Sequence, residues 1–155
     1  MKILLAHDGL VRRSALRSSA RVIVSLHVAS GALAGALAGS RRAALAAGPL
    51  THLAGDRMPH QDIASRRFEI VSGTGLLLLL AVRRGPLDPA VLGAVAAAVP
   101  DAEHVFPLPR PGGRKLFPSH RVRRWHRAGG VPAWAQLLAA GSVLGALAAR
   151  RSTAR

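Results

Sequence analysis

The sequence predicts an all-α protein, a small integral membrane helical bundle of about five hydrophobic helices. Half of the residues are apolar, yet only 3% are aromatic and Tyr is absent. The apolar residues are mostly Ala, Leu and Val, and 16 Gly accompany them, a mixture that suits close helix–helix packing through small residues. In addition, two stretches carry no charge over nearly the length that a membrane-spanning helix needs.

Apolar runs separated by arginine pairs and Gly/Pro loops define the helices in order. The first and last runs are uncharged throughout and are the convincing spans, whereas the middle three are shorter and either tilt or pack as half-buried helices. The predicted helices cover residues 22–39, 43–59, 68–82, 89–106 and 131–149.

The length of the chain predicts one domain with basic ends. We expect a basic N-terminal tail over residues 1–21, a helical membrane domain over 22–149 and a basic C-terminal tail over 150–155. The domain contains a basic cytoplasmic loop over 107–130, and its Pro/Gly-rich beginning predicts irregular structure. The apolar run in the N-terminal tail is too short for a secretory signal.

The net charge of +15 has two explanations, a nucleic-acid partner or the cytoplasmic loops of a membrane protein. Most of the 22 Lys and Arg residues fall in the tail and in the 57–67 and 110–127 loops, which share one side of a five-span bundle. This distribution predicts a multi-pass protein of the inner (plasma) membrane, with the lipid bilayer as partner and a cytoplasmic N terminus. Nucleic acid is disfavoured because the aromatic side chains that stack on bases are nearly missing.

The stretch THLAGDRMPHQD, at residues 51–62, concentrates ionisable side chains at the end of a predicted helix. His52 and Asp56 are four residues apart and share one helix face, as two ligands of a helical metal site must. Pro59 ends the helix and lets His60 or Asp62 approach from another direction. Because Cys is absent, a metal site in this chain must use nitrogen and oxygen ligands.

A second group of ionisable residues ends the fourth predicted helix. Asp101 and His104 are three residues apart on one face, directly after Pro100, and His120 lies in the basic loop. Two such pairs facing each other would supply four nitrogen and oxygen ligands. Plainer interpretations stay open, since Asp101 can be a helix cap and His27 can form a hydrogen bond between helices.

Three motifs resemble those of a known family. HLAGDRMPHQD resembles the H-x-x-x-D-x-x-P-H-x-D signature of small bacterial inner-membrane metal-dependent hydrolases, AAAVPDAEHVF resembles their LPD-x-[DE]-H motif, and LFPSHR resembles a third, Ser-His element. That family is similar in motif to zinc-dependent phospholipase C and single-strand nucleases. The resemblance covers roughly residues 24–121. It implies six metal ligands, namely His52, Asp56, His60, Asp101, His104 and His120.

The resemblance also implies a function, the hydrolysis of a phosphate- or ester-containing substrate with a divalent metal. Zinc is the first choice of metal, with manganese and magnesium as alternatives. Asp62 and Glu103 are then candidates either for the general base or for outer contacts that hold the metal ligands. Phosphate on a lipid or small substrate would be attracted by the basic loop through Arg114, Lys115 and Arg121. The alternatives are a non-enzymatic membrane protein with a structural or transport metal site, or a polar helix interface without metal.

Overall fold

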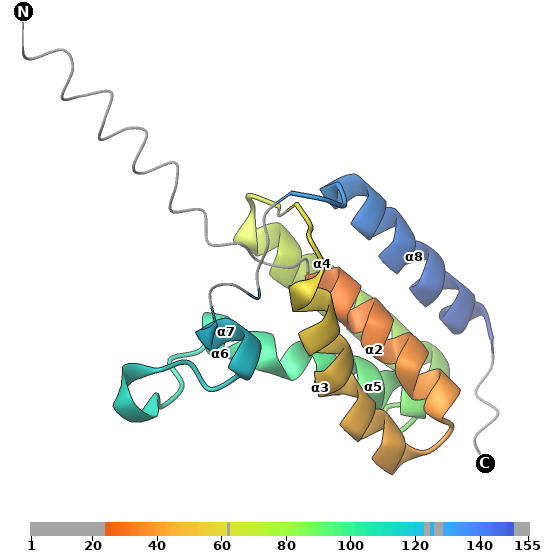
Figure 1. Ribbon diagram of the computed structural model, residues 1–155. Helices are drawn as coiled ribbons and strands as arrows, with labels where there is room; N and C mark the ends of the chain where they lie inside the picture. The colour runs from red at the N-terminus through yellow and green to blue at the C-terminus, as the bar shows by residue number, and fades with distance from the viewer. Residues whose placement is uncertain (1–23, 62, 123–124, 126–128, 151–155) are drawn as a thin grey trace, which may run out of the picture.

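The computed structural model describes residues 24–61, 63–122, 125 and 129–150, and the elements in these ranges are helical (Figure 1). The all-α prediction is therefore confirmed. The five long helices are α2 (Val24–Ala38), α3 (Arg41–Arg57), α4 (Arg66–Arg84), α5 (Pro89–Ala98) and α8 (Ala133–Ala149). Four short elements complete the fold: η1 (Val99–Asp101), α6 (Ala102–Val105), η2 (Pro111–Gly113) and α7 (Pro118–Arg121).

Side-chain caps fix where three of the long helices begin. The Ser40 hydroxyl accepts from the backbone N–H of Ala43 at the start of α3, and Ser65 does the same at the start of α4. Asp88 caps α5, where its Oδ1 lies 2.9 Å from the Ala90 nitrogen. At the other end of α5, Pro100 interrupts the predicted 89–106 helix, which continues as η1 and α6.

Helix α2 is the centre of the bundle and contacts α3, α4, α5 and α8 (Figure 1). Its contact with α5 is made by backbone atoms. A Cβ atom placed on Gly93 would lie 2.3 Å from the Gly31 carbonyl oxygen, and one placed on Gly31 would lie 2.4 Å from the Gly93 carbonyl oxygen. Helix α3 approaches α5 equally closely at Gly48. The sequence prediction of close packing through small residues is thus confirmed.

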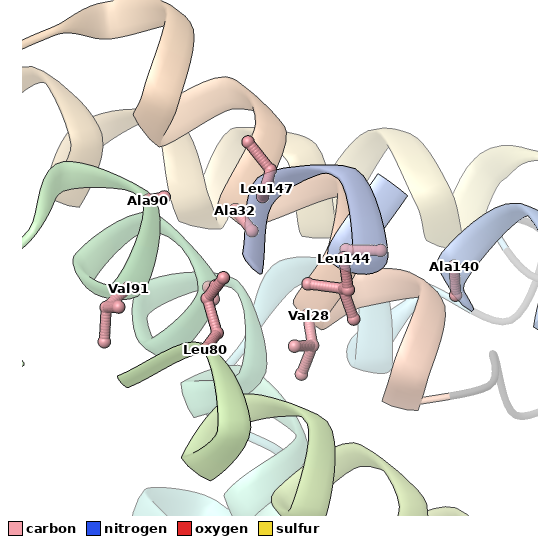
Figure 2. Close-up of a cluster of buried hydrophobic side chains, with 10 residues drawn as sticks. Val28, Ala32, Leu80, Ala90, Val91, Ala140, Leu144 and Leu147 are labelled. Carbon is pink, nitrogen blue, oxygen red and sulfur yellow. The ribbon is translucent and has the colours of Figure 1, made fainter. Parts of the chain in front are cut away.

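The apolar core lies where α2, α4, α5 and α8 meet (Figure 2). Val28 of α2, Leu80 of α4 and Leu144 of α8 are each at most 3% exposed. Arg84 clamps one end of this core: its guanidinium donates to the carbonyl oxygens of Leu147 and Arg150 at 3.1 Å and pairs with Asp88 at 3.0 Å.

No helix within the described residues is both long and apolar enough to cross a bilayer. The uncharged run at 22–39 supplies only the 15 residues of α2. At the helical rise these span about 22 Å, less than the ~30 Å hydrocarbon core. Helix α4 has 19 residues but carries arginines at both ends and Glu69 in its first turn. The predictions of a membrane-spanning bundle and of a multi-pass inner-membrane location are therefore wrong.

Candidate metal centre

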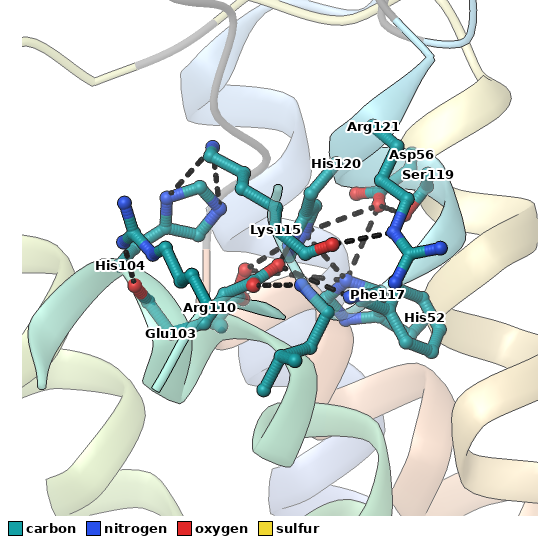
Figure 3. A network of polar contacts seen from close by, with 12 residues as sticks. His52, Asp56, Glu103, His104, Arg110, Lys115, Phe117, Ser119, His120 and Arg121 are labelled. Carbon is teal, nitrogen blue, oxygen red and sulfur yellow. Dashed lines mark hydrogen bonds and ion pairs between the residues drawn. The ribbon is translucent and has the colours of Figure 1, made fainter. Parts of the chain in front are cut away.

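The candidate site forms at the end of the bundle where α3 and α5 both terminate (Figure 3). The two helices lie side by side and run in the same direction, because each is antiparallel to α2: Gly31 and Gly35 of α2 meet Ala97 and Pro89 of α5, and Gly55 of α3 meets His27 of α2. The 3-10 turn η1 and helix α6 continue from α5, and α7 packs against α3. Four predicted ligands meet here, from three different elements: His52, Asp56, Asp101 and His120.

The His52 ring is held in the orientation of a metal ligand. Its Nδ1 lies 2.7 Å from the Ala97 carbonyl oxygen, which can only accept, so Nδ1 carries the proton. In the neutral ring, Nε2 is then bare and faces the cluster. A hydrogen bond on the far nitrogen is what fixes the tautomer of metal-binding histidines.

His120 is held in the same way by a carboxylate. Its Nδ1 donates to Glu103 Oε1, and Glu103 Oε2 accepts from the backbone N–H of Leu116 at 2.6 Å. Burial disfavours the charge on Glu103, but the N–H of Leu116 and the ring of His120 hold the pKa of Glu103 below its usual range. An ionised Glu103 fixes the proton of His120 on Nδ1 and turns Nε2 toward the cluster.

Four ligand atoms converge at spacings that suit one metal ion. His52 Nε2 lies 3.2 Å from Asp56 Oδ2 and 3.3 Å from His120 Nε2, and the latter two atoms are 3.6 Å apart. Asp101 Oδ1 lies 3.7 Å from His120 Nε2 and 4.0 Å from His52 Nε2. Tetrahedral ligands at about 2.1 Å from an ion are about 3.4 Å from one another. The buried His and Asp groups could therefore hold a metal ion.

In the metal-free protein the cluster binds protons that a metal cation could replace. Two imidazole nitrogens whose protons lie on the far side of each ring face two carboxylates. Burial opposes a charge on His52, but the nearby Asp56 and Asp101 raise the pKa of His52 above its usual value. Burial also raises the pKa of Asp101 to about 7. Without metal, protons occupy these groups, and a divalent ion would take their place.

Asp56 is supported from both of its oxygens. Ser119, which is fully buried, donates its hydroxyl to Asp56 Oδ2. On the other side, His27 Nε2 of α2 lies 3.3 Å from Asp56 Oδ1. Burial disfavours the charged form of Asp56, but the His27 and His52 rings hold the pKa of Asp56 well below its usual range. Asp56 is thus ionised, as a metal ligand must be.

Asp101 is the side of the cluster that solvent can reach. Its side chain is 19% exposed, against at most 2% for His52, Asp56 and His120. Its Oδ2 has no hydrogen-bond partner among the described residues. Phe117 closes a neighbouring side, with its ring 5.0 Å from that of His52.

The structure places two other predicted ligands beside the cluster rather than in it. His104 forms a separate group with Glu103 and His120, and Lys115 Nζ lies 3.2 Å from His104 Nδ1. His60 is buried, with Nδ1 2.5 Å from the Met58 carbonyl oxygen, and it lines a different cavity. The predicted base Asp62 lies outside the described residues, and the ligand roles of His60 and His104 stay predictions.

Basic side chains surround the outer edge of the centre, as Figure 3 shows. Lys115 contacts His104, and Arg121 donates to the Lys115 carbonyl oxygen. Arg110 donates to the Glu103 carbonyl oxygen at 2.9 Å, a contact that the sequence did not suggest. Arg114, also predicted to bind substrate, is exposed on the same loop. The arrangement gives an electropositive edge next to Asp101.

The sequence missed His27 and Ser119 as parts of the centre. His27 was the lone ionisable side chain in an uncharged run, and that isolation was the available signal. Its partner Asp56 is on another helix, so no local spacing connects the two. Ser119 precedes His120 in the third motif, but its bond to Asp56 spans 63 residues of sequence.

Comparison of the chain with protein-family models, with curated proteins and with solved structures found no match in any of the three. The resemblance to inner-membrane metal-dependent hydrolases therefore rests on the three sequence motifs alone.

Proposed function

We propose that the protein binds one divalent metal ion, zinc in the first place, through His52, Asp56 and His120, and that it is a metal-dependent hydrolase. The observation that carries the proposal is the set of three nearly equal distances, 3.2, 3.3 and 3.6 Å, between the ligand atoms of these residues. A facing set of two imidazoles and one carboxylate with one side open is the usual form of a catalytic zinc site.

The remaining residues of the centre have positioning and acid–base roles. Glu103 and the Ala97 carbonyl hold the two imidazoles, and Ser119 holds Asp56. A divalent ion held by these residues would supply Lewis-acid chemistry, polarising an ester or phosphoryl oxygen and lowering the pKa of a water molecule. Asp101 accepts the proton of the attacking water at Oδ2, the unpartnered oxygen on the exposed side.

The positive charges at the edge of the metal centre indicate the class of substrate. The ammonium of Lys115 is close enough to act electrostatically on Asp101, and the guanidinium of Arg121 contacts the Lys115 backbone, so these cations would attract an anionic group. A phosphate ester fits this edge better than a neutral carboxylic ester does. We therefore rank phosphate-containing small molecules first and carboxylic esters second.

A structural metal site is the second candidate. Asp101 Oδ1 lies near enough to both histidines to act as a fourth ligand, which would complete a closed tetrahedral site without a place for water. The role of Asp101 separates the two functions. A base can be replaced without loss of the ion, whereas a fourth ligand cannot be replaced without weakening its binding.

The test compares metal content and hydrolysis in Asp101→Asn, Asp56→Ala and the unmodified protein. After zinc loading and desalting, zinc is measured by elemental analysis, and hydrolysis is followed with nitrophenyl phosphates and nitrophenyl esters. We expect Asp56→Ala to lose the metal. We expect Asp101→Asn to keep it while hydrolysis falls by a factor of about 10² to 10⁴, the usual contribution of a general base.

Other outcomes change the conclusion in distinct ways. An unmodified protein that binds no zinc and no manganese would leave a polar helix interface. A protein that binds zinc but hydrolyses none of the substrates, with the ion lost in Asp101→Asn, would be a structural metal protein. Circular dichroism of each variant checks that the helices are retained.

A further inference from the structure

His27 is not among the three ligands of the proposed ion, although His27, His52 and Asp56 together form another group that could hold a metal. His27 lies in the middle of the fold, 1% exposed, and neither of its ring nitrogens has a hydrogen-bond partner among the described residues. Buried polar atoms without partners are rare, and each calls for a physical reason.

The contact between His27 and Asp56 has the geometry of two ligands rather than of a hydrogen bond. His27 Nε2 is 3.3 Å from Asp56 Oδ1, yet the two atoms do not align as donor and acceptor. Two ligands of one ion point at the ion and not at each other. With distances of about 2.1 Å to the ion, a 3.3 Å separation corresponds to a nearly tetrahedral angle.

The two oxygens of Asp56 face two different sets of nitrogens. Oδ2 faces His52 and His120, whereas Oδ1 faces His27. A carboxylate in this arrangement can bridge two ions. Pairs of ions about 3.5–4 Å apart are common in enzymes that hydrolyse phosphate esters.

From this geometry we propose a second metal position, held by His27 Nε2 and Asp56 Oδ1 and linked to the first ion through the Asp56 carboxylate. The second position rests on the proposed function, since Asp56 must first be a metal ligand. It would take a divalent ion of the same class, such as zinc or manganese, bound by nitrogen and oxygen.

A cavity of about 150 Å³, lined by Gly55, Met58 and His60 among others, lies near the proposed second position. Gly55 has no side chain, and a Cβ atom there would lie 2.9 Å from Cε1 of His27. Gly55 therefore contacts the His27 ring and also lines this cavity, which His27 itself does not line.

The experiment counts ions per folded chain. The full-length protein is stripped with a chelator, loaded with zinc and desalted, and its zinc is measured by elemental analysis against the protein concentration. The variants are His27→Ala and the bulkier His27→Gln, and the control is Ser25→Ala, a change at another fully buried polar residue of α2. Circular dichroism confirms that each variant is folded.

We expect about two zinc ions in the unmodified protein and in the control, and about one in the folded His27 variants. One ion in the unmodified protein and one in the His27 variants would overturn the second position but leave the first. One ion that disappears with His27 would also overturn it, because His27 would then bind the single ion. Zinc absent from every protein would overturn both the second position and the proposed function.

Discussion

Each imidazole that faces the centre is set by a bond on the opposite side of its own ring. His52 is set by the Ala97 carbonyl and His120 by Glu103. These two acceptors differ in kind. The Ala97 backbone carbonyl is retained whatever side chain replaces Ala97, whereas the carboxylate of Glu103 is lost when that residue is substituted. The orientation of His120 is therefore the point at which a single substitution can loosen the site.

Glu103→Gln tests that point. We expect the affinity for zinc to fall about tenfold, the lower end of the effect of such outer contacts, because the neutral amide no longer stabilises the protonated Nδ1 of His120. The measurement is competition with a chromogenic zinc chelator. Glu69→Gln is the matched control, a buried glutamate on α4 that belongs to none of the candidate metal groups. Equal affinity in both variants would contradict the role of Glu103.

The affinity for metal should also depend on pH. Burial raises the pKa of Asp101 to about 7 in the metal-free protein, and Asp56 and Asp101 raise that of His52 against the effect of burial. Below these pKa values the groups hold protons that an incoming ion must displace. We expect the affinity for zinc to fall by a factor of at least about 10 per pH unit between pH 7 and pH 6. Calorimetric titration in buffers of different ionisation enthalpy counts the protons released; none released would contradict this prediction.

Local spacing explains which parts of the centre the sequence could predict. His52 and Asp56 are four residues apart on α3, and the helix itself brings them together. The sequence pointed to Asp101 and His120 through motif similarity. In the structure they lie beside His52 and Asp56 because the chain turns at Pro100 and again before α7. His27 could not be found in this way, since its contact with Asp56 depends on how α2 packs against α3.

Among the helices, the α2–α5 pair decides the spacing of the site. The two backbones meet at Gly31 and Gly93, so neither position has room for a methyl group. Helix α5 carries the Ala97 carbonyl that holds His52, one turn beyond Gly93. A shift of α5 away from α2 would therefore move the Ala97 carbonyl and disturb the orientation of His52 in the metal centre.

Gly93→Ala measures the constraint. The new methyl carbon would lie 2.3 Å from the Gly31 carbonyl oxygen, and we expect a loss of about 1–3 kcal/mol in the free energy of unfolding together with weaker zinc binding. Gly141→Ala on α8 is the control, because its methyl group would meet nothing within 4 Å. There, the better helix propensity of Ala should add up to about 1 kcal/mol. Urea denaturation gives both values, and stabilisation by Gly93→Ala would refute the packing argument.

Over the whole molecule, the sequence predicted the positions of the helices well, but the prediction that they span a membrane was wrong. Four of the five apolar runs form a helix close to the predicted range, whereas the predicted 89–106 helix is divided into α5, η1 and α6. The membrane assignment failed because uncharged length in the sequence was equated with helix length, and because the arginine pairs were taken as membrane boundaries. Arg84, in the pair at 83–84, instead binds Asp88 at the start of α5 and the Leu147 carbonyl oxygen at the end of α8. A count of charges along the chain cannot distinguish these two uses of arginine.

The end of the molecule held by Arg84 should be independent of the metal centre. Arg84→Ala removes the ion pair with the buried Asp88 and the guanidinium donor to two carbonyl oxygens, those of Leu147 in α8 and of its C-cap Arg150. We expect a loss of about 2–3 kcal/mol in stability, seen as a lower thermal midpoint. Zinc content per folded chain should not change. A loss of zinc in this variant would show that the two ends are coupled.

The glycine contact between α2 and α5 has a consequence for the entropy of folding. Side chains of most residues lose rotamer freedom when they are buried, at up to about 2 kcal/mol each for the long ones, but Gly and Ala have essentially none to lose. Gly31, Ala32, Gly93, Ala94 and Ala97 all lie in or beside this contact and are buried. The helix that carries the Ala97 carbonyl is thus docked without immobilising flexible side chains, and backbone surfaces that fit at van der Waals distance keep it in place.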